Sequence, residues 1–419
     1  MSGRSEGEMD APGASKFVEK LMDGAEVEWV ALGELGELIR GNGLQKKDLT
    51  ESGVPAIHYG QIYTYYRLWT ATTKSFVSED LAKSLRKVDY GDVIITNTSE
   101  NIEDVATALV YLGKQQAVTG GHATIFKPGP TINGKYLAYF TQTDIFSIGK
   151  RPFARGAKVI DISASNLAKI AVPIPCPTNP EKSLAIQAEI VRILDTFTEL
   201  TTELTTELTT ELTARKKQYE YYRDQLLTFD EDEVEWKTLG ELGDNLDSRR
   251  KPIASNQRQP GEVPYYGASG VVDFVKEHIF EGDFLLISED GANLLARSTP
   301  IAFSACGRIW VNNHAHVIEF ETYVDRKFVE YYLNSIDLTP YISGAAQPKL
   351  NQSNLNRIPV PDPRREVKHR IVAILDHFDT LTTSLTEGLP REIELRRKQY
   401  AYYRDLLLSF PGARKASDG

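Results

Sequence analysis

The 419-residue sequence contains little of what disulfide scaffolds, metal centres and membrane proteins require. Its two cysteines, Cys176 and Cys306, are far apart and lack the close spacing of metal ligands. So little cysteine is typical of a reducing compartment, and we expect a cytoplasmic protein. No run of eighteen apolar residues is present, so neither a membrane-spanning helix nor a membrane partner is expected. The first residues, MSGRSEGEMDAPGAS, lack an apolar signal core.

Motifs for catalysis are also missing. The sequence has no glycine-rich phosphate loop, no Gly-x-Ser-x-Gly and no His-Glu-x-x-His. Segment 288–291, SEDG, places two carboxylates together, but a solvated turn after a strand is the simpler interpretation. His314 and His316 would share a strand face, yet no third metal ligand is spaced near them. The chain therefore predicts no catalytic residue, no metal site and no cofactor of its own.

An internal duplication dominates what is present. EVEWVALGELGELIRG (26–41) returns as EVEWKTLGELGDNLDS (233–248), and IVRILDTFTELTTEL (190–204) returns as IVAILDHFDTLTTSL (371–385). RKKQYEYYRDQLLTF (215–229) returns as RRKQYAYYRDLLLSF (396–410). The unit is a variable globular block, an Asn-Leu-x-x-Ile exit and a long helix, and it occurs twice.

The two long helices are indicated by apolar residues that recur every three to four positions. Each would run about 40 residues, or roughly 60 Å, and would need to bury its apolar stripe. The simplest partner is the other copy, in either direction, and a two-fold arrangement would make the pair antiparallel. We assign Leu200, Leu204, Leu208, Leu212, Tyr221, Leu381, Leu385 and Tyr402 to the helix pair or to a partner interface. Gly388 and Pro390 predict a kink or break.

The fold class predicted is α+β, with two globular domains separated by the helix pair and related by a pseudo-two-fold repeat. Strands are expected at 92–96, 123–126, 284–288, 300–305 and 316–320, and helices at 78–88 and 325–336. The predicted boundaries are a disordered tail 1–14, a short helix 15–25, a first domain 26–183, a central helix 184–229, a second domain 230–363, a C-terminal helix 364–411 and a tail 412–419.

Basic and amide side chains in polar loops are candidates for DNA contact, although the net charge is −10. DNA feels only the surface that faces it, and much of the acidic excess lies in the tail, the central helix and 230–235. Arg and Lys can neutralise phosphates, and Gln and Asn can read adenine edges. The alternative is ordinary solvated surface. The candidates are Lys46, Lys47, Arg67, Lys74, Arg151, Arg155, Lys158, Arg249, Arg250, Lys251, Arg258, Gln347 and Lys349.

The duplicated frame, the paired Leu-Asp-x-Phe helices and the segments RKKQYEYYRDQLL and RRKQYAYYRDLLL resemble the specificity subunit of type I restriction–modification enzymes. The resemblance covers the chain from about residue 15. It implies a non-catalytic subunit with two target-recognition domains, each reading one half of a split, asymmetric double-stranded DNA site. It also implies two modification (methyltransferase) subunits and restriction (translocase and nuclease) subunits as partners. S-adenosylmethionine, ATP and Mg²⁺ would then lie on those partners.

The segment TTELTTELTTEL (201–212) is similar to a tetrad repeat known in that family. Four helical residues add about 6 Å and rotate the helix end by about 40°. One base pair advances about 3.4 Å and rotates about 35°. We therefore expect the repeat to set the spacer between half-sites, the alternative being helical filler.

Two other functions stay open from the residues alone. A coiled-coil scaffold could bind a protein or glycan through two unrelated lobes. Salt-sensitive DNA binding would exclude that possibility. A self-contained DNA-modifying enzyme is the other, and the missing cofactor loops count against it.

Overall fold

The computed structural model describes residues 20–22, 24–230, 232–344, 347–384 and 386–410. The chain divides into two compact units: unit 1 comprises Met1–Thr205 and Glu394–Gly419, and unit 2 comprises Thr206–Ile393. The tails expected at 1–14 and 412–419 lie outside the described residues. Most of the helix expected at 15–25 also lies outside them, although residues 20–22 are helical. Within the described ranges, every helix is too short or too polar to cross a membrane.

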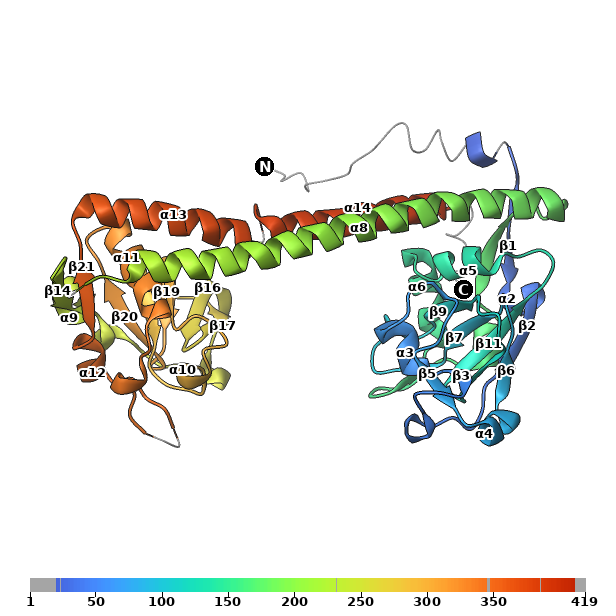
Figure 1. The fold of residues 1–419 in the computed structure, drawn as a ribbon, viewed down its shortest axis with the longest axis horizontal. Coiled ribbons are helices and arrows are strands. Elements are labelled where there is room, and N and C mark those ends of the chain that lie inside the picture. Colours follow the sequence, from blue (N-terminus) through green and yellow to red (C-terminus); the bar gives the residue numbers. More distant parts are fainter. Residues whose placement is uncertain (1–19, 23, 231, 345–346, 385, 411–419) are drawn as a thin grey trace. The chain divides into compact units, whose positions relative to one another are not determined.

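Unit 1 combines short helices with four small sheets (Figure 1). Its strands are β1 (Val27–Ala31), β2 (Gly36–Arg40), β3 (Val54–Ile57), β4 (Trp69–Thr70), β5 (Ser75–Val77), β6 (Arg86–Val88), β7 (Val93–Thr96), β8 (Thr98–Ser99), β9 (Ala108–Tyr111), β10 (Ala117–Thr119), β11 (Ala123–Pro128), β12 (Ile160–Asp161) and β13 (Ala171–Pro175). Its short helices are α2 (Leu32–Leu35), η1 (Lys46–Asp48), α3 (Tyr59–Thr64), α4 (Glu79–Ser84), α5 (Gly134–Phe140), α6 (Asp144–Lys150), η2 (Arg151–Phe153) and α7 (Ala164–Leu167).

Unit 2 is built around one six-stranded sheet. Its strands are β14 (Glu235–Thr238), β15 (Asp244–Asn245), β16 (Pro260–Gly267), β17 (Gly270–Val275), β18 (Phe280–Ser288), β19 (Ala302–Val311), β20 (Ala315–Glu319) and β21 (Pro359–Asp362). Its short helices are α9 (Leu239–Leu242), η3 (Asp247–Arg249), η4 (Ser255–Gln257), α10 (Asn293–Ala296), α11 (Tyr323–Ser335), η5 (Thr339–Tyr341) and α12 (Gln352–Asn356). The long helices are α8 (Pro180–Leu227), α13 (Arg365–Thr383) and α14 (Leu389–Leu407).

The repeated sequence frame closes each domain in the same way. In unit 1, β1 pairs antiparallel with β13, so that Trp29 lies opposite Pro173. In unit 2, β14 pairs antiparallel with β21, so that Trp236 lies opposite Pro361. The entry segment of each block is therefore hydrogen-bonded to its proline-rich exit.

Each domain contains a sheet of the same topology, although the sequences of the two interiors are dissimilar. The order β2-β11-β7-β9-β4 in unit 1 matches β15-β20-β18-β19-β16 in unit 2. The first three pairings are antiparallel in both units, and the last, β9 with β4 or β19 with β16, is parallel in both. Unit 1 adds the separate sheet β5-β3-β10-β6, whereas unit 2 extends its sheet with β17.

The expected elements are largely present. The strands predicted at 92–96, 123–126, 284–288, 300–305 and 316–320 correspond to β7, β11, β18, β19 and β20, and the helix predicted at 325–336 corresponds to α11. The helix predicted at 78–88 is wrong in its second half, because α4 ends at Ser84 and Arg86–Val88 forms β6. These residues pair with β10, so a long-range ladder replaces the last helical turn.

Within each unit, two long-helix segments pack together through the repeated Leu-Asp-x-Phe motif. Leu194 and Leu375 are fully buried. In unit 1, Phe197 of α8 meets Tyr403 of α14 with ring centroids 5.8 Å apart. In unit 2, Phe378 of α13 meets Tyr222 of α8, also at 5.8 Å. α8 leads into β14 and α13 follows β21, so the pairing of these strands brings the end of α8 to the start of α13 and makes the two helices antiparallel.

The leucines of the TTEL repeat are less buried than the stripe predicts. Leu200 is 56% exposed, so it is not buried between helices of this chain, and its assignment to a partner interface stays a prediction. Leu204, Leu208, Leu212 and Leu381 are half-buried, and Leu385 lies outside the described residues. The neighbouring threonines satisfy their hydroxyls locally, since Thr205 and Thr210 donate to the carbonyls of residues 201 and 206. The stability of the TTEL stretch thus depends less on a buried apolar face than the stability of the two ends of α8 does.

The break predicted near Gly388 and Pro390 is confirmed, because α13 ends at Thr383 and α14 begins at Leu389. The N-terminal segment and the end of α14 contribute to one core. Met22, Leu408 and Phe410 are buried in the same apolar cluster of unit 1.

Candidate nucleic-acid interface

Equivalent loops meet at one edge of each domain. Thr98 in β8 pairs with Asp161 in β12, and at the equivalent place in unit 2 Asp290 forms a bridge with Lys349. Asp161 and Lys349 each end a loop. A bridge between Arg155 and Asp161 closes the first loop, and a bridge between Ser343 and Lys349 closes the second. Gly156 and Gly344 begin these turns with φ of 106° and 84°, a region that favours glycine. We call this edge the rim of each domain: residues 97–99, 122 and 155–161 in unit 1, and residues 289–290, 314, 343–344 and 347–349 in unit 2.

Beneath the unit 2 rim lies a buried ion pair between His316 of β20 and Asp247 of η3. Their side chains are 0% and 5% exposed. His316 Nδ1 lies 2.5 Å from Asp247 Oδ2, and Nε2 lies 2.7 Å from the carbonyl oxygen of Leu350. A carbonyl oxygen and an ionised carboxylate can only accept, so both ring nitrogens donate. Through these two contacts His316 ties Asp247 to the rim loop at Leu350.

Two further cations extend this pair into a network. Arg250 Nη1 lies 2.5 Å from Glu289 Oε2, and Arg250 Nη2 lies 3.3 Å from Asp247 Oδ2. Lys349 Nζ lies 3.0 Å from Glu289 Oε1. The interpretation of 288–291 as a solvated turn is therefore wrong for Glu289, which is 8% exposed. Burial beside Arg250 and His316 accounts for the difference, since a buried charge requires partners.

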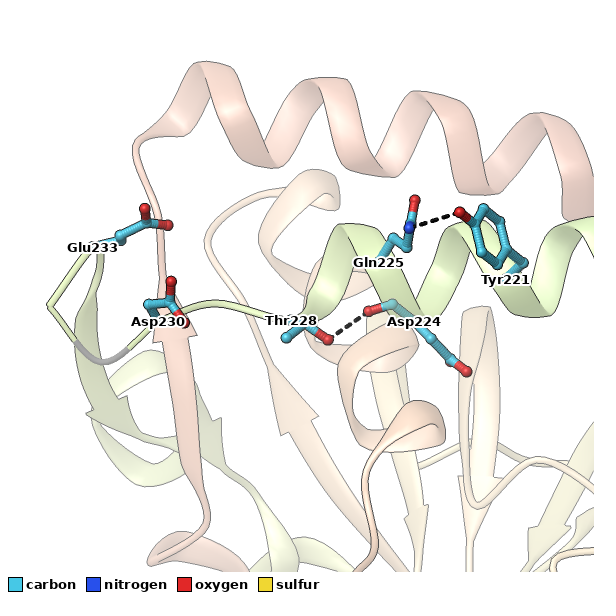
Figure 2. A pocket seen from close by; sticks show the side chains of 6 residues that line it. All are labelled: Tyr221, Asp224, Gln225, Thr228, Asp230 and Glu233. Atoms are coloured by element: carbon cyan, nitrogen blue, oxygen red, sulfur yellow. Dashed lines mark hydrogen bonds between the residues drawn. The ribbon is translucent and has the colours of Figure 1, made fainter.

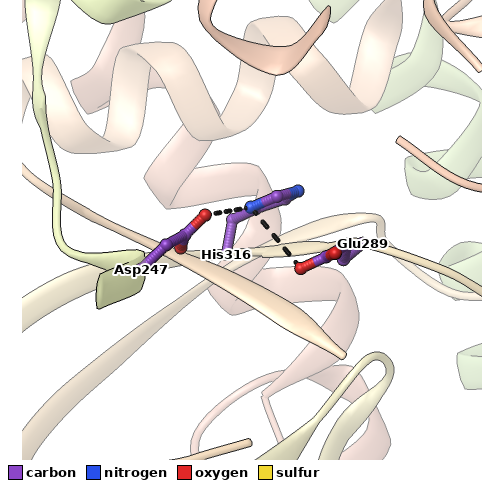
Figure 3. Close-up of side chains that lie close together, drawn as sticks. All are labelled: Asp247, Glu289 and His316. Atoms are coloured by element: carbon purple, nitrogen blue, oxygen red, sulfur yellow. Dashed lines mark hydrogen bonds and ion pairs between the residues drawn. The ribbon is translucent and has the colours of Figure 1, made fainter. Parts of the chain in front are cut away.

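Asp247, Glu289 and His316 could in principle hold a metal ion, because one ligand atom from each lies within 4.8 Å of the others (Figure 3). The donor set does not fit one. His316 Nε2 donates to a carbonyl, and the Arg250 guanidinium already bridges both carboxylates. The guanidinium supplies the positive charge that a metal would supply. The network thus holds the rim loop of unit 2 in place.

Both carboxyl groups of the network titrate below their ordinary range. Burial alone would raise the pKa of Asp247, but the hydrogen bond and charge of His316 outweigh burial and lower it. Burial likewise opposes ionisation of Glu289, but hydrogen bonds from Arg250 and Lys349 lower its pKa. Both carboxyl groups are therefore ionised at neutral pH.

Unit 1 fills the equivalent space with uncharged groups. Thr124 of β11 donates to Asn97 Oδ1 at 2.9 Å, and Asn97 Nδ2 donates to the carbonyl of Ile162 at 2.6 Å. Asn97 and Thr124 are fully buried. The two rims thus have the same backbone frame and different side-chain chemistry.

Several predicted DNA-contact residues of unit 1 lie at or near its rim. Lys46 and Lys47 are exposed in η1. Burial, then the neighbouring His122 and then Lys46 lower the pKa of His58. Arg155 is part of the rim loop and donates to the carbonyls of Pro152 and Ala154. Lys158 is exposed within that loop, and Arg151 is exposed in η2.

Two other candidates of unit 1 lie on the α3–β5 segment instead. Arg67 Nη1 donates to Thr202 of α8 at 2.7 Å. Lys74 Nζ lies 4.4 Å from the centroid of the Tyr65 ring. DNA contact by this pair stays a prediction, and the rim does not include them.

The basic run of unit 2 separates into different environments. Arg250 is committed to the buried network, whereas Lys251 is exposed and Arg249 packs over Phe280 at 4.8 Å. Arg258 lies 3.0 Å from Asp273 Oδ2 and over Tyr265 at 4.4 Å. Treating Arg249, Arg250 and Lys251 as one flexible cluster is therefore wrong. η3 and the network fix Arg250 in place.

Gln347 and Lys349 lie in the rim loop, as the sequence placed them in one polar loop. Both are exposed, and the Lys349 side chain is 51% exposed despite its bond to Glu289. Sequence reasoning missed the network itself. Its members come from segments far apart in the chain, and no local spacing marks them.

The ends of the helix repeats carry a different surface. Tyr221, Asp224, Gln225, Thr228, Asp230 and Glu233 line an open hollow of about 600 Å³ (Figure 2). Gln225 donates to the hydroxyl oxygen of Tyr221 at 2.8 Å. Three carboxylates disfavour a phosphate backbone at this hollow. Tyr402 occupies the matching place on α14, where Tyr402 and Tyr403 repeat the edge-on contact of Tyr221 and Tyr222.

Two copies of one sheet, each with a polar rim of its own chemistry and joined by a long helix, define a tandem recognition protein. The model of the type I restriction modification DNA specificity domain matches residues 25–214 and 231–395. The chain belongs to this family and is a specificity subunit of a type I restriction–modification system with two target-recognition domains.

Relatives support this assignment over most of the chain. The sequence is 36% identical to the type I restriction enzyme EcoR124I/EcoR124II specificity subunit of Escherichia coli, covering 94% of this chain and 97% of that protein. It is 34% identical to the EcoprrI specificity subunit of Escherichia coli, covering 88% and 92%. A structure solved in work on complex assembly and conformational transition of the type I R-M system matches with a TM-score of 0.61 at 14% identity, covering 91% and 97%. This last likeness concerns the fold alone.

Proposed function

We propose that this subunit binds a bipartite, asymmetric site on double-stranded DNA, with one half-site for each domain. The observation that carries the proposal is the pair of equivalent rims with different side chains. A shared backbone frame would present both domains to the same kind of ligand. The buried groups beneath the rims differ, Asn97 and Thr124 in unit 1 and Glu289 and His316 in unit 2, and would hold the two rim loops differently, so that each rim has its own selectivity. Exposed lysines at both rims would neutralise phosphates.

The subunit itself is proposed to be non-catalytic. Two modification subunits would bring S-adenosylmethionine, and restriction subunits would bring ATP and Mg²⁺. The catalytic and cofactor motifs missing from this sequence support that division of labour. We propose a cytoplasmic location, in keeping with the low cysteine content.

The tyrosine-rich helix ends are proposed to dock the modification subunits. Tyr221 is 59% exposed and Tyr402 is 37% exposed, and the adjoining Arg223–Asp224 and Arg404–Asp405 pairs are alike at 2.7 Å. Two matching surfaces would suit two copies of one partner. Near Tyr221, three carboxylates would suit a basic partner surface.

Binding to DNA by the full complex tests the main proposal. The subunit is produced with its modification subunits, and methylated adenines are mapped in the host genome by single-molecule sequencing. A split motif with a fixed spacer is expected. Titration of the complex with that duplex at rising salt should show a steep fall in affinity. The proposal would be contradicted if no split motif were methylated, or if the affinity for the duplex did not change with salt concentration.

Partner docking has a separate test. Tyr221→Ala and Tyr402→Ala should each weaken assembly with a modification subunit in sedimentation, and the double variant should abolish it. Tyr90→Ala is the matched control, because Tyr90 is 71% exposed on unit 1 and is not part of a long helix. Full assembly of the double variant together with lost DNA binding would refute the docking role.

A further inference from the structure

His122 and His314 occupy the same position in the two domains. Each immediately precedes a central strand, His122 before β11 and His314 before β20. The carbonyl oxygen of His122 accepts from Asn97 N at 2.8 Å, and that of His314 accepts from Glu289 N at 2.9 Å. Two domains with dissimilar interiors therefore place the same side chain at the same exposed point of the rim.

The imidazole rings are also held in the same way. His122 Nδ1 lies 3.0 Å from Thr98 Oγ1, and His314 Nδ1 lies 2.8 Å from Asp290 Oδ2. Thr98 and Asp290 are themselves the residues to which the rim loops attach. The orientation of each ring is thus tied to the frame of its domain.

One nitrogen of each ring remains available to an outside group. The Asp290 carboxylate accepts from Nδ1–H of His314, which leaves Nε2 for another partner. Among the described residues, no hydrogen bond to Nε2 of His122 or His314 occurs. The His314 side chain is 50% exposed, and His122 is exposed as well.

Basic residues lie on chain segments that neighbour both histidines. Asp290, the partner of His314, forms a bridge with Lys349, and the Lys251 backbone N–H bonds to Val311 in the strand that leads to His314. The ring of His122 packs 4.9 Å from that of Tyr59. The preceding residue, His58, lies within electrostatic reach of Lys46. A planar hydrogen-bonding group on a surface whose neighbouring segments carry lysines suits base reading, because basic residues can position the duplex while the ring contacts a base edge.

We infer that His122 and His314 are equivalent base-contacting residues, one for each half-site. This inference rests on the proposed function and adds the specificity-determining residue of each rim. An imidazole nitrogen can accept from the amino group of adenine or cytosine, or donate to N7 or O6 of guanine, in the major groove. The buried networks beneath the rims hold the rim loops in place, and the two histidines contact the base edges.

Competition binding tests the inference on the full complex with its modification subunits. Duplexes carry the mapped site with one base pair exchanged at a time. His122→Ala should lower the preference roughly 10-fold at one position of one half-site, and His314→Ala should do so at one position of the other. Asp290→Ala frees the ring of His314 without removing it, and should weaken the preference at that same position.

His369→Ala is the matched control, since His369 is exposed on α13. It should leave every preference unchanged. Selectivity retained by His122→Ala and His314→Ala at all positions would overturn the inference, and so would an equal loss of affinity for all duplexes. A wild-type complex with no split motif would instead refute the proposed function, so the two failures are distinguishable.

Discussion

The hydroxyl of Tyr139 donates a hydrogen bond to Asp195 Oδ1 at 2.8 Å and so joins α5 to α8 in unit 1. Tyr331 and Asp376 repeat this bond at 2.6 Å between α11 and α13 in unit 2. Both tyrosines are buried, and burial together with the neighbouring carboxylate raises the pKa of each, so each stays a donor. The aspartate of the repeated Leu-Asp-x-Phe motif thus fixes each domain to its long helix.

Removing this hydroxyl should loosen the docking of a domain without unfolding it. Tyr139→Phe leaves Asp195 bonded to Lys135 at 2.8 Å, and Tyr331→Phe leaves Asp376 bonded to Tyr323 at 2.8 Å. We expect each change to lower the free energy of unfolding by about 1–3 kcal/mol in urea denaturation. Binding should then tolerate altered spacers better, while the half-sites stay the same. Tyr90→Phe, at an exposed tyrosine, is the control. Unchanged spacer selectivity in both variants would mean that the bond serves stability alone.

The basic run of unit 2 should separate by function. Arg249→Ala with Lys251→Ala should reduce the salt slope of DNA binding by about one unit per lost phosphate contact. Arg250→Met should instead destabilise unit 2 by roughly 3–5 kcal/mol, because it leaves buried Glu289 and Asp247 short of a partner. Salt titrations and urea denaturation measure the two effects. A slope that changes only with Arg250→Met would contradict this assignment.

Unit 2 should lose stability in acid. The pKa values of Asp247 and Glu289 are lower in the folded state than in the unfolded state, so their contribution is fully present above the unfolded values of about 4. It is lost as pH falls through the folded values. Urea denaturation between about pH 6 and pH 2 should show this loss. Asp247→Asn should flatten the dependence, and an equally steep curve would show that other carboxyl groups cause it.

Lys150 should make unit 1 gain stability in mild alkali. Its side chain is buried and donates to the carbonyls of Glu103 and Val105, and burial lowers its pKa to about 8. Between about pH 8 and the unfolded value near 10.4 the unfolded state binds more protons, so stability contributed by this group rises with pH. Lys150→Met should remove that rise in denaturation measured from pH 7 to 10. The exposed neighbour provides the control, as Arg151→Met should retain it.

Deleting Thr205–Leu208 removes one TTEL tetrad from the continuous helix α8. The apolar stripe stays in phase, and the helix shortens by about 6 Å and turns by about 40°. We expect the half-sites to stay the same and the spacer to shorten by about one base pair. Mapping methylated adenines in cells that carry the deletion measures both. Full activity with an unchanged spacer would show that the repeat is filler.

The sequence by itself determined the duplicated frame, the continuous first long helix and the break in the second. These features follow from local information: exact repeats, apolar residues at helical spacing, and Gly388 and Pro390 where α13 gives way to α14. The same local reading failed at Arg86–Val88, because pairing with a distant strand outweighs helical preference there. It also overestimated the burial of Leu200, since a leucine stripe does not show how much of itself a partner covers.

Only the tertiary structure decided that the two dissimilar interiors contain sheets of the same strand order, each with a rim at the same edge. Strand order depends on pairings between distant segments, which no single stretch of sequence specifies. Glu289, Arg250 and His316 became one buried network for the same reason, because desolvated charges require partners and folding supplies them from separate loops. The likeness of His122 and His314 also emerged in this way, since their equivalence lies in backbone hydrogen bonds and not in the residues around them.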